Sequence, residues 1–423
     1  MRITGACVAL GVFCLAATAS APPSFYLHNG DTVVFYGDSI TARLLYSVYT
    51  EAFVTARFPQ MRVRFIHSGW GGDRVNGGAG GTIEQRLERD VFAYRPTVVT
   101  ILLGMNDGSY QPLQPQTLEK YTQGYRHIIE LIRKRLPQAR ITLLKPSPYD
   151  DVTRPPDFEG GYDAVQMRLG DVVEQLAKSE HLDVADLHAP ALALLNAVRS
   201  LPPREAQMLI PDRVHPSEGI HLVMAEALLK AWHAPSMVTA VAINAATGEI
   251  VRAVNTSVHD VARGHALSWT QEDHALPMAL DKGPETIPLA LHYTDVVNAL
   301  DQQTLQVTGL NSGRYRLQID DEIIGWFEAR ELERGINLGP LSTPMARQSL
   351  AVQIEAFKHN NLHVASWRMV QDAYKDDHLP GTRAAAEALQ TLELHAIELE
   401  HNMAQPKAHR YRLATERTIT EGQ

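Results

Sequence analysis

The sequence has little cysteine: two residues in 423, Cys7 and Cys14, both near its beginning. They fall in an apolar stretch that follows Arg2 and ends in a small-residue cleavage site at Ala19, which is typical of a secretory signal at residues 1–19. Cleavage there would remove both thiols. We therefore expect an exported mature chain, periplasmic or extracellular, without a disulfide, a cysteine-bound metal or a thiol nucleophile.

Long apolar runs and blocks of like charge are also absent from the sequence. The apolar part of the signal, residues 6–16, is too short to span a bilayer comfortably, so no stable membrane anchor is expected after cleavage; an uncleaved anchor is the alternative. The formal net charge of −9 disfavours a nucleic-acid partner. With 45% hydrophobic and 21% charged residues, a chain of this length is expected to form two globular domains.

Short apolar segments alternate with segments of helical periodicity in the first half of the chain. The predicted strands are residues 32–36, 63–67, 97–103, 140–144 and 182–186. The predicted helices are residues 41–57, 118–136, 164–179 and 220–232. Strands that are apolar throughout and alternate with helices predict a parallel sheet covered on both faces, a three-layer α/β/α fold whose reactive loops follow the strand ends.

Four short blocks occur along this region in one order. They are Gly37-Asp38-Ser39-Ile40, Gly69-Trp70-Gly71-Gly72-Asp73, Gly104-Met105-Asn106-Asp107 and Asp212-Arg213-Val214-His215. Together the blocks resemble those of the GDSL-type esterases, also called SGNH hydrolases, over residues 30–235. The resemblance implies a flavodoxin-like α/β fold, with an open catalytic site in a domain that we place at residues 20–235. The G-x-S-x-G motif of the α/β-hydrolases does not occur.

Ser39 is the predicted nucleophile. Because a serine hydroxyl needs a base within hydrogen-bond reach, His215 is the predicted base, oriented by the carboxylate of Asp212. A helix-capping role is the alternative for Ser39. His221 is the alternative to His215 as the base. Asp183 and Asp186, which have His188 near them in the sequence, are the alternatives to Asp212.

Three donors are predicted for the oxyanion that develops during ester cleavage. They are the backbone N–H groups of Ser39 and Gly72 and the side-chain amide of Asn106. Gly71 is the alternative to Gly72, which is chosen because the donor glycine of the family pattern precedes an aspartate. His67 departs from that pattern, in which asparagine is frequent at this place.

Carboxylates flank the predicted catalytic residues at Asp38, Asp73 and Asp107. A divalent cation held by oxygen atoms alone needs about six to eight of them in one place. We therefore interpret these side chains as acceptors that fix loops. No metal and no cofactor is expected, since the serine mechanism needs neither.

Aromatic side chains lie in loops that are predicted to surround the site, including the long loop at residues 146–161. They can stack on sugar rings, although packing is the more common role of such side chains. The predicted substrate-binding residues are Trp70, Tyr110 and Tyr149, and Phe158 and Tyr162 are further aromatic residues of these loops.

The second part of the chain carries no chemical motif. Residues 236–404 are predicted to form a smaller mixed α and β region, with hairpins at 238–254 and 314–328 and a further strand at 305–308. Helices are predicted at 344–375 and 380–402, and a flexible tail at 405–423. Substrate docking, dimerisation and bracing of the catalytic domain are all open as roles, and so is the oligomeric state.

These observations predict an exported serine ester hydrolase that acts through an acyl-enzyme. The predicted partners are small esters or acetylated saccharides, and the first choice of substrate is an O-acetyl group on carbohydrate, because export, an open site and aromatic loops favour it. A lipase or lysophospholipase is the alternative among esterases. A non-catalytic carbohydrate-binding or surface protein with a relict site is the alternative of another class.

Overall fold

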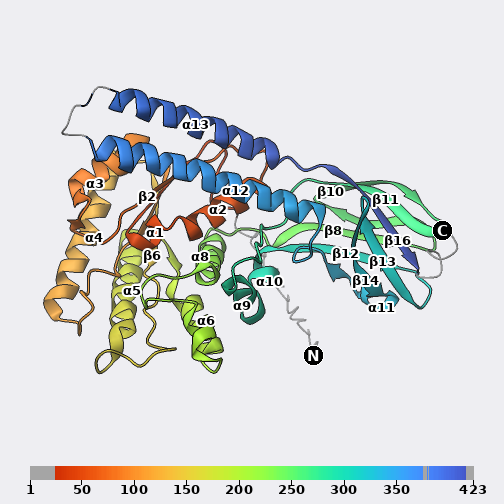
Figure 1. The fold of residues 1–423 in the computed structure, drawn as a ribbon, viewed down its shortest axis with the longest axis horizontal. Coiled ribbons are helices and arrows are strands. Elements are labelled where there is room, and N and C mark those ends of the chain that lie inside the picture. The colour runs from red at the N-terminus through yellow and green to blue at the C-terminus, as the bar shows by residue number, and fades with distance from the viewer. Residues whose placement is uncertain (1–23, 375–378, 380, 416–423) are drawn as a thin grey trace, which may run out of the picture.

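The computed structural model describes residues 24–374, 379 and 381–415, and the predicted signal at 1–19 lies outside them. The first part of the chain forms a parallel five-stranded sheet in the order β2-β1-β5-β6-β7 (Figure 1). Its strands are β1 (Thr32–Gly37), β2 (Arg64–Gly69), β5 (Val98–Leu102), β6 (Arg140–Lys145) and β7 (Asp183–Asp186). β1 and β5 are buried almost throughout, as expected of strands that are covered on both faces. The predicted parallel sheet is confirmed.

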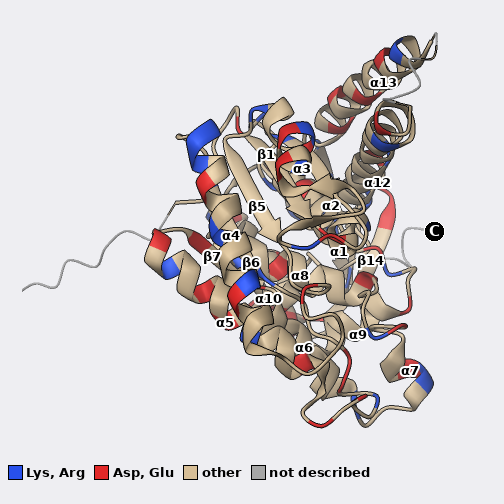
Figure 2. Cartoon of the chain, turned by 90° about the vertical axis from the view of Figure 1, so that its left-hand side faces the viewer, with Lys and Arg blue, Asp and Glu red and all other residues tan. Residues whose placement is uncertain are grey.

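Helices pack in pairs around this sheet. α2 (Leu45–Arg57) packs against α8 (Glu218–Ala231), and α4 (Pro115–Arg135) packs against α5 (Gly161–Glu180). The shorter helices are α1 (Ser39–Ala42), α3 (Ile83–Asp90), a 3₁₀ turn (Phe92–Tyr94), α6 (His188–Val198) and α7 (Pro203–Gln207). Figure 2 shows acidic and basic residues mixed along α3, α4 and α5. The helix predicted at 41–57 is divided, because Leu44 adopts a left-handed conformation with φ 65°.

The second part of the chain forms two further sheets around a hydrophobic core of their own. One sheet has the order β10-β11-β16-β13-β14, and the other has the order β15-β12-β8-β9. The strands are β8 (Met237–Asn244), β9 (Glu249–Val254), β10 (Thr256–Ala262), β11 (Ala266–Asp273), β12 (Gln302–Thr308), β13 (Arg314–Ile319), β14 (Glu322–Glu328), β15 (Ile336–Asn337) and β16 (Ala408–Thr415). The predicted hairpins are β8–β9 and β13–β14. Between strands lie α9 (Thr286–Tyr293), α10 (Val296–Leu300) and α11 (Ala329–Arg334).

The flexible tail predicted at 405–423 is wrong for residues 408–415. These residues form β16, which lies between β11 and β13 in the middle of a sheet. Tyr411 and Leu413 are buried in the core, whereas Arg410 and Arg412, which alternate with them, are exposed. The alternation is that of a strand with one buried face, but the two arginines give the segment a polar composition. Residues 416–423 lie outside the described residues.

Two long helices run from the second part of the chain back along the catalytic domain (Figure 1). α12 (Pro344–Val364) continues into a π-helical stretch (Ala365–Asp372), and α13 (Thr382–Met403) returns antiparallel to it. We call residues 344–372 and 382–403 the helical arm. α12 packs against α2 and contacts β2, so the arm covers one side of the catalytic domain.

A buried arginine joins the two parts at the end of α2. The guanidinium of Arg57 donates hydrogen bonds to the carbonyl oxygens of Pro235, at 2.9 Å, and Leu300, at 2.7 Å. Its Nη2 atom lies 3.7 Å from Oδ1 of Asp301, and both side chains are almost fully buried. Across the described part of the chain, no helix has the length and apolar character needed to cross a membrane.

Candidate active site

The nucleophile loop lies where β1 ends. Gly37 is the last residue of the strand, and a Cβ atom there would lie 2.2 Å from Oγ1 of Thr41 and 2.7 Å from the carbonyl oxygen of Leu102, so only glycine fits. Asp38 is the N-cap of α1, and its Oδ1 atom accepts a hydrogen bond from the backbone N–H of Ile40 at 2.9 Å. Ser39 therefore begins the short helix α1 at the carboxyl end of a central strand, where its side chain is partly exposed.

The predicted nucleophile, base and carboxylate lie in one chain of hydrogen bonds. Oγ of Ser39 is 2.9 Å from Nε2 of His215, and Nδ1 of His215 is 2.6 Å from Oδ2 of Asp212. This places the Nδ1 proton toward the carboxylate and leaves Nε2 to accept the serine proton. The structure thus brings together three residues that are up to 176 positions apart in the sequence.

The carboxylate of Asp212 is held by its own loop. Its Oδ1 atom accepts hydrogen bonds from the backbone N–H groups of Val214, at 3.0 Å, and His215, at 2.7 Å. Burial alone would raise the pKa of Asp212, but these bonds and the His215 ring outweigh it, so the pKa lies below its ordinary value. The carboxylate therefore stays ionised and can stabilise an imidazolium on His215.

The competing histidines and carboxylates have other partners. His221 is fully buried on α8, where Nδ1 accepts the backbone N–H of Tyr46 at 3.3 Å, and burial lowers the pKa of its ring to about 3. Nδ1 of His188 lies 3.1 Å from the carbonyl oxygen of Pro146. Asp186 pairs with Lys145 at 2.7 Å. None of these contacts involves the nucleophile loop.

Two of the three predicted oxyanion donors, Gly72 and Asn106, lie in loops that contact each other. Nδ2 of Asn106 donates to the carbonyl oxygen of Asp73 at 3.0 Å, and Oδ1 accepts from the hydroxyl of Tyr110 at 2.9 Å. One N–H of the Asn106 amide is thereby engaged, and a primary amide has a second. Gly72 adopts φ +78°, which favours glycine, whereas Gly71 is not among the residues of positive φ. Of the two glycines, Gly72 is therefore the one whose backbone conformation favours glycine.

The three flanking aspartates each accept a hydrogen bond, from a backbone N–H or from a buried arginine. Asp38 caps α1, Oδ2 of Asp73 accepts from Nε of Arg86 at 2.6 Å, and Oδ1 of Asp107 accepts from the backbone N–H of Val75 at 3.0 Å. Burial raises the pKa of both Asp38 and Asp107 to about 7. These contacts are those of side chains that fix loops.

The predicted substrate-binding aromatic residues separate into two places. The rings of Tyr110 and Tyr149 lie 6.2 Å apart, and both contact Tyr162. Tyr110 is 41% exposed, whereas Tyr149 is buried and its hydroxyl donates to Asp157 at 2.9 Å. Tyr110 is therefore the member of this group that a substrate can contact most readily.

Trp70 lies beside the helical arm. The guanidinium carbons of Arg368 and Arg89 lie 4.3 and 4.7 Å from the centre of its ring, and the ring meets Trp367 edge-on at 5.6 Å. These neighbours already occupy much of the ring surface. Stacking of a sugar on Trp70 would therefore require the arginines to move.

Sequence reasoning missed the buried network beneath this loop. Arg86 binds Asp73 and Asp90 and also donates to the carbonyl oxygens of Ser68, at 2.9 Å, and Gly37, at 3.4 Å. One guanidinium thus connects the ends of β1 and β2 with the residue that follows Gly72. Arg86 and Asp90 are four positions apart, a spacing that on a helix indicates an ion pair. Nothing in the sequence indicated that Arg86 would also bind backbone carbonyl oxygens.

The comparisons with known proteins identify the chain as a carboxylic ester hydrolase. Residues 35–222, less than half of the chain, match the model of the GDSL-like Lipase/Acylhydrolase family, so this segment is a GDSL-like domain. An acetylxylan esterase from Geobacillus stearothermophilus is 28% identical over 222 residues, which cover 48% of this chain and 94% of that esterase.

The likeness to one solved structure extends beyond the catalytic domain. A gut microbial diltiazem-metabolizing enzyme superposes with a TM-score of 0.78 at 24% sequence identity. The match covers 94% of this chain and 99% of that one. It shows that the whole architecture, including the two additional sheets and the helical arm, is a fold shared with another protein.

Proposed function

We propose that the chain cleaves esters through an acyl-enzyme formed on Ser39, in a catalytic domain at residues 20–235. Oγ of Ser39 attacks the ester carbonyl carbon while Nε2 of His215 takes its proton. The carbonyl oxygen becomes an oxyanion, which accepts hydrogen bonds from the N–H groups of Ser39 and Gly72 and from the amide of Asn106. The intermediate collapses, and His215 gives its proton to the departing alcohol.

The second half of the reaction repeats these steps with water. His215 removes a proton from a water molecule as its oxygen attacks the acyl carbon, and the collapse of the new intermediate returns a proton to Oγ of Ser39 and releases the acid. Asp212 holds the ring of His215 throughout. The observation that carries this proposal is the hydrogen-bond chain from Ser39 to His215, at 2.9 Å, and on to Asp212, at 2.6 Å.

Acetyl groups on carbohydrate are the proposed substrates. The main support is the relative that acts on acetylated xylan, which matches the catalytic domain over nearly its own full length. The exposed ring of Tyr110, whose hydroxyl contacts Asn106, offers an apolar surface for a sugar next to a proposed oxyanion donor. The signal-like residues 1–19 support export to where such polymers occur.

The second part of the chain is proposed to brace the catalytic domain. Arg57 of α2 is anchored on carbonyl oxygens of residues 235 and 300, and Trp367 of the helical arm donates to Asp90 of α3. The contacts of Arg57 with Leu300 and of Trp367 with Asp90 are buried, and they join the second part to helices that support the sheet. They favour bracing over the other two roles, substrate docking and dimerisation.

The test is an acyl-chain-length profile on p-nitrophenyl esters, followed by acetate release from acetylated xylan. We expect turnover to be greatest with acetate, to extend to the polymer, and to fall roughly 10⁴-fold or more in Ser39→Ala. Ser179→Ala, on α5, is the matched serine control and should retain full activity. Turnover greatest on long acyl chains would favour a lipase or lysophospholipase, and activity that survives in Ser39→Ala would contradict the mechanism.

A further inference from the structure

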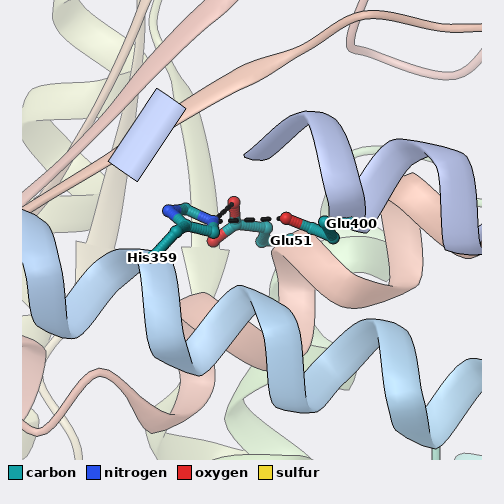
Figure 3. A group of neighbouring side chains, drawn as sticks. All are labelled: Glu51, His359 and Glu400. Carbon is teal, nitrogen blue, oxygen red and sulfur yellow. Dashed lines mark hydrogen bonds and ion pairs between the residues drawn. The ribbon is translucent and has the colours of Figure 1, made fainter. Parts of the chain in front are cut away.

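A second group of ionisable side chains is buried between the catalytic domain and the helical arm. Glu51 extends from α2, His359 from α12 and Glu400 from α13, and all three are at most 5% exposed (Figure 3). The serine mechanism uses none of them. Their meeting point lies at the seam where the arm covers the catalytic domain.

The three side chains direct one ligand atom each toward a common point. Nε2 of His359 lies 2.8 Å from Oε1 of Glu51 and 3.2 Å from Oε2 of Glu400, and one atom from each of the three residues lies within 4.8 Å of the others. Ligand atoms about 2.0–2.2 Å from a tetrahedral zinc ion are separated by roughly 3.3–3.5 Å. The two distances from His359 to the carboxylates, 2.8 and 3.2 Å, are slightly shorter than this separation, so the side chains would move apart a little to admit the ion.

The carboxylate of Glu51 is oriented by residues outside the cluster. Its Oε2 atom lies 3.0 Å from Nε2 of His67 and accepts from Nδ2 of Asn360 at 2.7 Å, which leaves Oε1 directed at His359. Metal-binding carboxylates in proteins are commonly hydrogen-bonded in this way by a second layer of side chains. His67, which departs from the family pattern in the sequence, has a role here.

A single imidazole nitrogen does not satisfy all the acceptor atoms of the cluster. Among the described residues, Oε1 of Glu400 has no hydrogen-bond partner although it is buried. The one proton on Nε2 of His359 faces an oxygen atom of each of two carboxylates, and one proton cannot satisfy both acceptors fully. A divalent cation with a neutral imidazole and two carboxylates gives a net charge of zero.

We propose that Glu51, His359 and Glu400 bind one Zn²⁺ ion, which fixes the helical arm to α2. Nitrogen and carboxylate oxygen are ligands that zinc accepts, and three protein ligands leave the fourth tetrahedral position to water. Binding releases the proton that Nε2 of His359 carries when the ion is absent. The ion joins three helices in a protein whose described residues contain no cysteine, so it takes the place of a disulfide between the two parts.

The test measures zinc binding by the untagged full-length protein. The protein is stripped with EDTA, exchanged into chelator-free buffer and titrated with Zn²⁺ alone by calorimetry, and its metal content is measured by mass spectrometry. We expect about one zinc per chain and a higher Tm with the ion bound. Glu400→Gln should weaken binding by more than the roughly 10–100-fold expected of Asn360→Ala, which removes only an outer partner.

His363→Gln is the matched control, because His363 lies one turn further along α12 and pairs with Glu393 at 3.4 Å instead. It should bind zinc as the unaltered protein does, which separates the site from adventitious binding by other histidines. Circular dichroism and esterase activity report whether Glu400→Gln is folded, and Asn360→Ala is a milder variant should it not be. A folded, unaltered protein that binds no stoichiometric zinc, or variants that bind it undiminished, would overturn the proposal and leave His359 as a proton bridge between two carboxylates.

Discussion

The indole N–H of Trp367 donates a hydrogen bond to Oδ1 of Asp90 across 2.6 Å. Trp367 belongs to the π-helical stretch of the helical arm, and Asp90 is the last residue of α3. Asp90 also binds Arg86, and Arg86 binds Asp73, which directly follows Gly72. Three consecutive buried contacts therefore connect the arm with the loop that carries a proposed oxyanion donor.

Trp367→Phe should lower kcat by roughly tenfold with little change in KM. The variant keeps an aromatic ring beside Trp70 but loses a hydrogen bond to a charged group, which is worth about 1.5–3 kcal/mol. The network can then relax, and a small displacement of the oxyanion loop weakens the stabilisation of the transition state more than that of the bound substrate. Steady-state kinetics on p-nitrophenyl acetate measure both constants.

Trp326→Phe is the matched control for this change. Trp326 lies on β14 in the sheet remote from the catalytic domain, where its ring packs beside Arg314 and Arg316. It should leave both kinetic constants unchanged. A fall in Tm without any change in kcat for Trp367→Phe would show that the arm stabilises the domain but does not position the loop.

Asn106→Ala should reduce kcat by about 10²–10³-fold, the usual loss when one oxyanion donor is removed. Tyr110→Phe removes the hydroxyl that holds Oδ1 of Asn106 and should cost much less, because the donor itself remains. Measurements of kcat at saturating substrate should show a larger fall for Asn106→Ala than for Tyr110→Phe. Equal effects would indicate that Asn106 serves the loop structure and not the oxyanion.

The four sequence blocks could indicate the proposed catalytic centre because each lies directly after a strand or before a helix. The ends of parallel strands meet at one edge of a sheet, so local patterns suffice to place Ser39, Gly72 and Asn106 near one another. The loop of His215 and Asp212 could be recognised because the two side chains are only three positions apart and bind each other.

The contacts of the helical arm could not be predicted in the same way. Trp367 and Asp90 are 277 positions apart, and His359 and Glu51 are 308 positions apart. Their side chains meet only because the arm folds back over the catalytic domain, and no local spacing records that path. β16 was missed for a related reason, since its partners β11 and β13 lie far away in the sequence and arginines occupy its exposed face.

Asp107→Asn should make stability less dependent on pH. Burial raises the pKa of Asp107 to about 7, and its Oδ2 atom has no hydrogen-bond partner among the described residues. Between pH 4 and 7 the native state holds a proton that the unfolded chain has released, so the free energy of unfolding falls as pH rises through this window and levels off above it. Asparagine cannot ionise, and its oxygen can still accept from the N–H of Val75.

Urea unfolding at several values between pH 4.5 and 8 measures this effect. The decline in unfolding free energy across the window should be smaller in Asp107→Asn by an amount on the order of 2 kcal/mol. Part of the decline should persist, because burial raises the pKa of Asp38 to about 7 as well. Asp171→Asn, at an exposed position of α5, is the control and should follow the unaltered protein. A variant as dependent on pH as that control would contradict the buried, protonated state of Asp107.

Arg57→Met should destabilise the protein by about 3–5 kcal/mol, because it leaves the buried carboxylate of Asp301 and two carbonyl oxygens without their donor. Arg62→Met is the matched control, since Arg62 pairs with Glu398 at 3.3 Å where both side chains are more than half exposed. Such a pair contributes at most about 1 kcal/mol. Urea unfolding at pH 8 compares the two variants. At this pH Asp301, whose pKa burial raises to about 6, is ionised in the unaltered protein.

If the two parts of the chain unfold separately once Arg57 is lost, the unfolding transition should divide into two steps. Only the step that reports the catalytic domain should then coincide with loss of esterase activity. Equal losses for the two arginine variants would mean that the seam does not depend on Arg57.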